Sequence, residues 1–120
     1  MSYPKMANLV LSLLRQTNNG KLGWDQTEKV DVFQASFPRY SVRIYTEQKS
    51  PFQMDYIIQI INDMGEIIEE VADTELNSVM DDAYRDMKDL FESARRNAMG
   101  VEQALDDLLD FLHPPFDDLL

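Results

Sequence analysis

The sequence predicts one α+β domain. An N-terminal helix is followed by an antiparallel β-meander of three or four strands, a long helix and a shorter helix (α-β-β-β-β-α-α). Two observations lead to this fold class. Apolar residues recur at helical spacing towards both ends of the chain, whereas between positions 29 and 71 they alternate with polar residues, as in half-buried strands. We expect one domain over residues 1–113 and an acidic, leucine-containing tail over residues 114–120.

The first helix is predicted over residues 2–18. Pro4 suits its first turn, where a missing N–H costs no helical hydrogen bond. Asn18-Asn19-Gly20 suits its end, because Asn and Gly tolerate the left-handed conformation found there. The apolar side of this helix carries Met6, Leu9, Val10, Leu13 and Leu14. The connector 21–28 contains the only tryptophan, Trp24, which we interpret as a packing anchor.

Two strands are predicted before position 47. Apolar and polar residues alternate over residues 33–37 and again over residues 40–45. The Pro38-Arg39 pair between them suits a tight turn. The polar segment 47–53 is predicted to be a loop.

The third strand is predicted from Met54 to Asn62 and is apolar on both sides for part of its length, which is typical of a central strand. Asn62-Asp63-Met64-Gly65 predicts a hairpin turn, with Gly65 supplying a positive φ. A short strand from Glu66 to Val71 would follow. Its glutamates would protect an exposed sheet edge against pairing with other chains.

The C-terminal half predicts two helices. Asp73 or Thr74 would begin a long helix, because nine apolar residues from Leu76 to Ala94 keep helical spacing. Gly100 would end it. A shorter helix would then run to the Pro114-Pro115 pair, with Val101, Ala104, Leu105, Leu108, Leu109 and Leu112 on its apolar side.

The net charge of −11 is unevenly distributed. Residues 1–54 have a net charge of +3, whereas residues 55–120 have a net charge of −14. The acidic half repels phosphate backbones and anionic lipids, so direct binding of nucleic acid or membranes is disfavoured. The absence of cysteine and of a signal-peptide pattern leads us to expect a cytoplasmic protein.

No pattern of residues predicts catalysis, a cofactor or a metal site. His113 is the single histidine, and no serine and acid are placed around it as in a catalytic triad. The many carboxylates fall opposite the apolar sides of the helices, which is typical of solvated surfaces. The four glycines do not form a phosphate-binding loop.

The C-terminal segment is the best candidate for a binding site. It combines apolar and acidic residues and contains no Lys or Arg from Val101 onwards. It could pack on the domain's own core, or its apolar side chains could dock in a groove of another protein. A self-complementary version would give a homodimer. The candidate partner-binding residues are Leu108, Phe111, Leu112, Phe116, Asp117, Asp118, Leu119 and Leu120.

The function that fits these observations best is a non-catalytic protein–protein interaction module, such as a regulator, adaptor, inhibitor or immunity-type protein. Its partner would be a protein, and a basic surface would suit it. The alternative is an acidic mimic of nucleic acid that blocks a DNA- or RNA-binding protein. A ligand-binding protein, metal-binding protein or enzyme that uses carboxylates ranks last. One sheet face, with Gln34, Ser41, Arg43 and Tyr45, is a second candidate surface if all helices cover the other.

Overall fold

The computed structural model describes residues 3–113 and confirms the α+β fold class. The five strands form one antiparallel meander in the order β1-β2-β3-β4-β5, one strand more than the sequence predicts. The elements in chain order are α1 (Tyr3–Asn18), β1 (Asp25–Gln26), β2 (Phe33–Ser36), β3 (Tyr40–Ser50), β4 (Gln53–Asn62), β5 (Ile67–Ala72), α2 (Asp73–Leu76), α3 (Ala83–Ala98) and α4 (Val101–Leu112).

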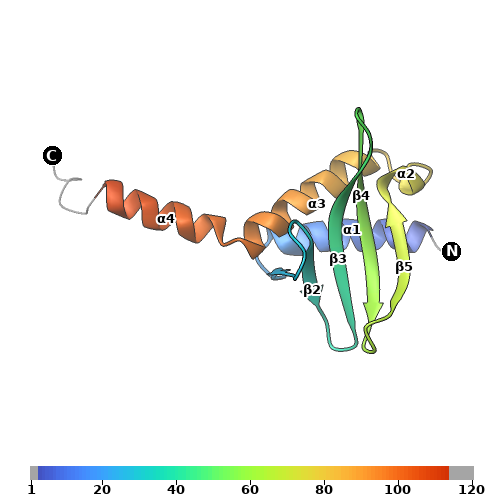
Figure 1. Cartoon of the computed structure of the whole chain (residues 1–120), viewed down its shortest axis with the longest axis horizontal. Helices are drawn as coiled ribbons and strands as arrows, with labels where there is room; N and C mark the ends of the chain where they lie inside the picture. The colour runs from blue at the N-terminus through green and yellow to red at the C-terminus, as the bar shows by residue number, and fades with distance from the viewer. Residues whose placement is uncertain (1–2, 114–120) are drawn as a thin grey trace.

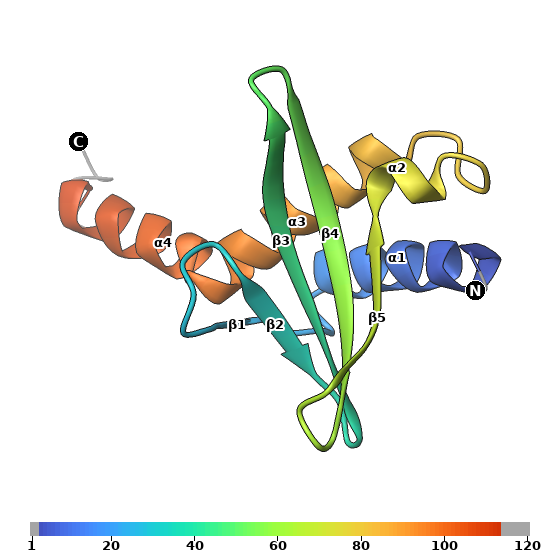
Figure 2. The same cartoon turned by 45° about the vertical axis from the view of Figure 1, so that its right-hand side comes forward.

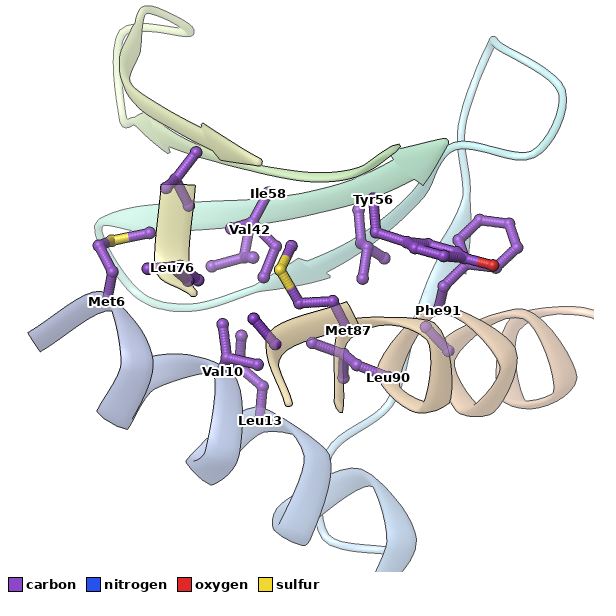
Figure 3. Packing of buried hydrophobic residues seen from close by; sticks show 14 of the residues in the cluster. Met6, Val10, Leu13, Val42, Tyr56, Ile58, Leu76, Met87, Leu90 and Phe91 are labelled. Atoms are coloured by element: carbon purple, nitrogen blue, oxygen red, sulfur yellow. The ribbon is translucent and has the colours of Figure 1, made fainter. Parts of the chain in front are cut away.

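Helices α1 and α3 lie against the same face of the sheet (Figures 1 and 2). The core fills the space between these layers, and Val10, Ile58 and Leu90 in it have no exposed surface (Figure 3). Each such side chain stabilises the fold by about 1.5–3 kcal/mol relative to an exposed one. Within residues 3–113, no helix covers the other face of the sheet, so that face is open.

The β3–β4 hairpin is longer than predicted. The expected loop 47–53 is wrong, because Glu47 pairs with Asp55 and Ser50 with Gln53. Pro51 and Phe52 alone form the turn. Backbone pairing continues beyond the core because it does not need apolar side chains, and the polar residues of this extension are exposed.

The connector around Trp24 contains a short strand that the sequence does not predict. Asp25 and Gln26 pair with β2 to form the edge strand β1. Trp24 is buried, as expected of a packing anchor, and its Nε1 donates a hydrogen bond of 2.9 Å to Thr17 Oγ1. Thr17 Oγ1 in turn donates to the Leu13 carbonyl at 2.6 Å.

The predicted long helix is interrupted, which corrects the expectation of one helix from position 73 or 74. A single turn, α2, ends at Leu76, and α3 begins only at Ala83. The intervening segment contains Asn, Ser and two Asp residues, whose side chains compete for backbone groups and weaken a helix. Asp82 caps α3 by accepting a 3.0 Å hydrogen bond from the Arg85 N–H. Met80 still reaches the core from the irregular segment.

Two predicted turns are confirmed. The Phe37 N–H donates to the Tyr40 carbonyl at 2.8 Å across the Pro38-Arg39 pair. Gly65 has φ +80° in the turn before β5, which begins at Ile67, one residue later than predicted. As for membranes, every helix within residues 3–113 falls short of the length and apolarity that a crossing requires.

Candidate functional site

Helix α4 extends away from the rest of the domain (Figures 1 and 2). Gly100, with φ +67°, separates it from α3. This left-handed conformation is inexpensive for glycine and ends α3 as predicted. Arg96 at the end of α3 forms an ion pair with Glu102 in the first turn of α4. A two-residue turn, Met99-Gly100, and an ion pair therefore set the direction of α4.

None of the residues of α4 is buried. Its apolar residues follow helical spacing and form one continuous stripe, which a packed helix would turn towards the core. The exposed fractions are 43% for Leu105, 58% for Leu108, 54% for Leu109, 84% for Phe111 and 64% for Leu112. Solvent therefore covers an apolar surface that soluble monomers usually bury or use for binding. We call these five residues the α4 stripe.

The opposite side of α4 is acidic. Glu102, Asp106, Asp107 and Asp110 lie on it, and residues 101–120 contain no Lys or Arg. Gln103 donates a 2.8 Å hydrogen bond to Asp107 across one helical turn. The helix thus has an apolar side bordered by negative charge.

The structure places three of the predicted site residues on α4. Leu108 and Leu112 lie one turn apart in the α4 stripe, and Phe111 lies at the side of the stripe. Leu105 and Leu109 also belong to it, although the sequence-based site did not include them. The helical spacing of Leu105 and Leu109 from Leu108 and Leu112 is the sequence signal that identifies them. The predicted residues 116–120 lie outside the described part of the chain.

An apolar groove of about 250 Å³ lies beside α1. Leu9 and Leu13 of α1, Leu22 of the connector and Phe37 of the β2–β3 turn supply its apolar lining. Its polar lining residues are Ser12, Gln16 and Lys21. We call this hollow the α1 groove. Sequence reasoning missed it, because its walls come from three separate segments that no periodicity connects.

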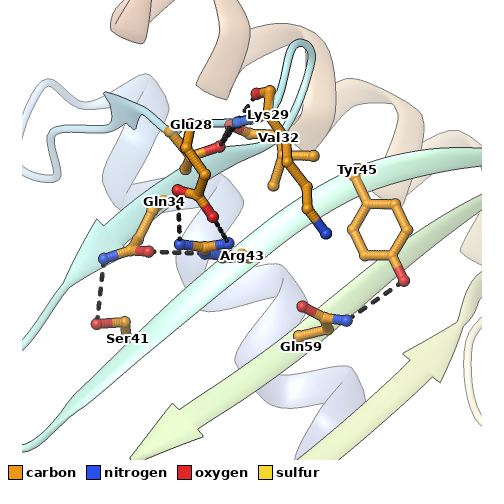
Figure 4. A network of polar contacts seen from close by, with 9 residues as sticks. Glu28, Lys29, Val32, Gln34, Ser41, Arg43, Tyr45 and Gln59 are labelled. Atoms are coloured by element: carbon orange, nitrogen blue, oxygen red, sulfur yellow. Dashed lines mark hydrogen bonds and ion pairs between the residues drawn. The ribbon is translucent and has the colours of Figure 1, made fainter. Parts of the chain in front are cut away.

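The open face of the sheet carries a row of polar side chains (Figure 4). The strand register aligns Gln34, Arg43, Gln59 and Glu70 across β2 to β5. Arg43 Nε donates to Gln34 Oε1 at 2.8 Å, and Gln59 Nε2 donates to Glu70 Oε2 at 2.7 Å. Gln34 also donates to Ser41 Oγ at 3.4 Å, and Gln59 donates to the Tyr45 hydroxyl, so the four predicted polar residues share this face.

Most groups on this open face already have partners within the chain. Arg43 binds both carboxylate oxygens of Glu28, at 3.1 and 3.3 Å. The pKa of the Glu28 carboxyl is lowered by a hydrogen bond from the backbone of Glu28 itself, and the Arg43 guanidinium lowers this pKa further. Burial raises the pKa of Tyr45, to whose hydroxyl Gln59 donates. The face is therefore a solvated surface whose polar groups satisfy one another.

Two buried carboxylates lie where β4 meets α2. Asp73 Oδ1 accepts a 2.7 Å hydrogen bond from the Tyr56 N–H, and Asp55 Oδ1 accepts one of 3.0 Å from Gln53 Nε2. Burial raises the pKa of Asp73, the Tyr56 hydrogen bond opposes this, and the nearby Asp55 charge raises the pKa further. Neither residue lines the α1 groove. The Asp73 hydrogen bond connects α2 to β4, whereas the Asp55 hydrogen bond lies within β4.

The single histidine and three aspartates near the start of α3 can also be placed. His113 follows the last turn of α4, where its N–H donates to the Leu109 carbonyl at 2.8 Å. Asp86 lies on the polar side of α3, where Arg85 approaches it to 3.5 Å. Asp81 and Asp82 precede α3 and do not lie on it, which corrects the sequence interpretation. Among residues 3–113, no three His, Cys, Asp or Glu side chains gather closely enough to hold a metal ion.

Comparison with protein-family models, with curated proteins and with solved structures finds no match for this chain.

Proposed function

We propose that this protein is a protein–protein interaction module that binds through α4. The single observation that carries the proposal is the α4 stripe, a continuous row of exposed leucines and a phenylalanine on a helix that buries none of them. Amphipathic helices of this kind bind by placing the apolar side in a groove of a partner, with side chains one turn apart as anchors. A structural helix of the same composition would cover its own core.

The charge of α4 specifies the chemistry of the partner. Four carboxylates border the α4 stripe; Glu102 is paired with Arg96, and residues 101–120 contain no Lys or Arg to offset the other three. A groove with an apolar floor and Lys or Arg at its rim complements such a helix, and opposite charges speed association. An acidic groove would repel it. The partner we propose is therefore a protein with an apolar groove and a basic rim.

The acidic mimic of nucleic acid is a weaker explanation of the same charge. A mimic needs a row of free carboxylates spaced like phosphates, whereas α3 interleaves its acids with arginines. Arg85 approaches Asp82 and Asp86, and Arg95 approaches Glu92 at 3.3 Å. These contacts reduce the negative field along α3 and favour the interaction module.

Affinity capture with matched variants tests the proposal. Immobilised wild type, Leu108→Ser and Asp106→Ser would be compared on an extract of the producing organism. Loss of one buried leucine removes about 1.5–3 kcal/mol, which is roughly a tenfold to hundredfold weaker complex. We expect Leu108→Ser to lose a partner that wild type and Asp106→Ser both retain in roughly 0.5 M salt, where surface charges are screened. A partner that Leu108→Ser retains and that dissociates in high salt would instead support the nucleic-acid mimic.

A further inference from the structure

The chain itself contains a groove that matches its exposed helix. The α1 groove has an apolar lining of Leu9, Leu13, Leu22 and Phe37, and its volume of about 250 Å³ admits branched aliphatic side chains. Phe37 is 41% exposed there, so the groove also leaves apolar surface in contact with solvent. One chain thus presents both an apolar helix side and an apolar hollow, and neither has a partner within residues 3–113.

The charges of the two surfaces are opposite. Residues 1–24 contain Lys5, Arg15 and Lys21 and no acidic residue. All three cations are exposed, and Lys21 lines the groove itself. Helix α4 has four carboxylates and no cation. A leucine-bearing helix with acidic borders therefore meets in the α1 groove an apolar floor with one lysine, Lys21, in its wall, on a segment of the chain that carries no negative charge.

The direction of α4 keeps this helix away from the groove of its own chain. It leaves the domain at Gly100, and the Arg96–Glu102 ion pair holds its first turn against the end of α3. The helix that fills the groove must therefore come from a second chain. Exchange of α4 between two chains is reciprocal, so both helices and both grooves are used in one closed two-fold assembly.

The other symmetric arrangement pairs the two α4 helices directly. It would cover the leucines, but it would also bring the carboxylates of both helices together without any cation on either. Like charges across an interface cost several kcal/mol. The charges therefore favour the groove over the helix pair.

We infer that the protein forms a homodimer in which α4 of each copy lies in the α1 groove of the other. This inference rests on the proposed function, because it names a second copy of the chain as the partner of the α4 stripe. The leucines of α4 contact Leu9, Leu13, Leu22 and Phe37, while Lys21 faces the acidic border of the incoming helix.

Cross-linking between two different single-cysteine variants tests the arrangement directly, since the chain has no cysteine of its own. One preparation carries Leu109→Cys on α4 and the other carries Gln16→Cys at the groove. We expect oxidation of the mixture to give a covalent dimer of twice the 13.9 kDa chain mass, and each preparation alone to give no covalent dimer. Phe52→Cys at the distant β3–β4 turn replaces Gln16→Cys in the control and should give no product. Covalent dimers from Leu109→Cys alone would overturn the inference in favour of the helix pair.

The dissociation constant of the dimer, measured by sedimentation or light scattering, provides a second test. We expect Leu108→Ser and Lys21→Glu each to weaken the dimer by roughly tenfold or more, as truncated anchors of an interface do. Lys29→Glu, an equal charge change outside the groove, should leave it unchanged. A wild-type chain that stays at 13.9 kDa at every concentration overturns the homodimer. That result does not contradict the proposed function if Leu108→Ser still loses a captured partner. The homodimer and the interaction module can therefore be refuted separately.

Discussion

At the scale of single residues, buried polar groups determine where elements join. Thr17 links Trp24 to α1 through two hydrogen bonds, so the indole N–H is satisfied inside the core. Asn97 accepts a hydrogen bond of 2.6 Å from the Trp24 N–H through its side-chain oxygen. Such contacts join residues up to 73 positions apart. They depend on the tertiary structure, which is why the sequence predicts a buried tryptophan without identifying its partners.

The buried carboxyl of Asp73 should make the stability of the fold depend on pH. Burial raises its pKa above the usual 3.8 in the folded protein, so ionisation costs more in the folded than in the unfolded chain. The stability contribution of the protonated carboxyl is complete below pH 3.8 and is lost as pH rises through the raised pKa. Asp73→Asn keeps an oxygen that can accept from the Tyr56 N–H and does not titrate. We expect wild type to lose stability relative to Asp73→Asn across that window.

Urea unfolding of both proteins at a series of pH values measures this difference. Asp63→Asn, in the exposed turn before β5, is the control for removal of one negative charge. The free energy of unfolding of Asp73→Asn minus that of wild type should grow with pH across this window, and the same difference for Asp63→Asn should not. If both differences stay constant with pH, the buried carboxyl does not have the effect assigned to it.

At the scale of elements, the periodicity of apolar residues predicted the helices of several turns and the strands of several residues. Helix α1, the end of α3 at Gly100 and the start of α4 were predicted closely, because apolar spacing and a glycine mark each of them. Strand β1 could not be predicted, since two residues have no measurable period. The break between α2 and α3 was hidden because Met80 contributes to the core and keeps the apolar pattern continuous.

The candidate site was predictable only in part. Helical spacing identifies the apolar side of α4, and Leu108, Phe111 and Leu112 do lie on this helix. Spacing does not reveal whether another element covers that side, and packing on the domain's own core was an equal fit to the pattern. The α1 groove was out of reach for a different reason, since Leu22 and Phe37 meet α1 only after the sheet has formed.

Removal of α4 should leave the stability of the rest of the domain almost unchanged. Because α4 buries no residue, a chain ending at Gly100 should have the stability of the monomeric full-length protein within about 0.5 kcal/mol, as surface changes do. The core substitution Leu90→Ala should cost about 2–5 kcal/mol and serves as the positive control. Urea unfolding at low protein concentration compares the chain ending at Gly100 with full-length Leu108→Ser, in which self-association is weakened. A loss of several kcal/mol on truncation would mean that α4 packs on its own domain.

At the scale of the whole molecule, the shape is elongated, and α4 forms an acidic projection at one end. The chain extends over 60 × 35 × 25 Å, with α4 at one end of the long axis (Figure 1). The first 54 residues have a net charge of +3 and the remainder −14. A projecting acidic α4 and an α1 that carries only positive charges are suited to reciprocal contacts, in which α4 of each copy meets α1 of the other.

The radius of gyration tests this shape in solution. The Cα value is 17.1 Å, whereas a compact chain of this length has about 14 Å. We expect small-angle X-ray scattering of the Leu108→Ser monomer to give a value near 17 Å, and the chain ending at Gly100 to fall towards about 13 Å, the compact value for its length. Gly100 and the Arg96–Glu102 pair hold α4 outward, so the decrease should exceed what the loss of mass alone produces. If both chains scatter as compact particles, α4 folds back onto its own α1 groove, and the exchange between copies has no basis.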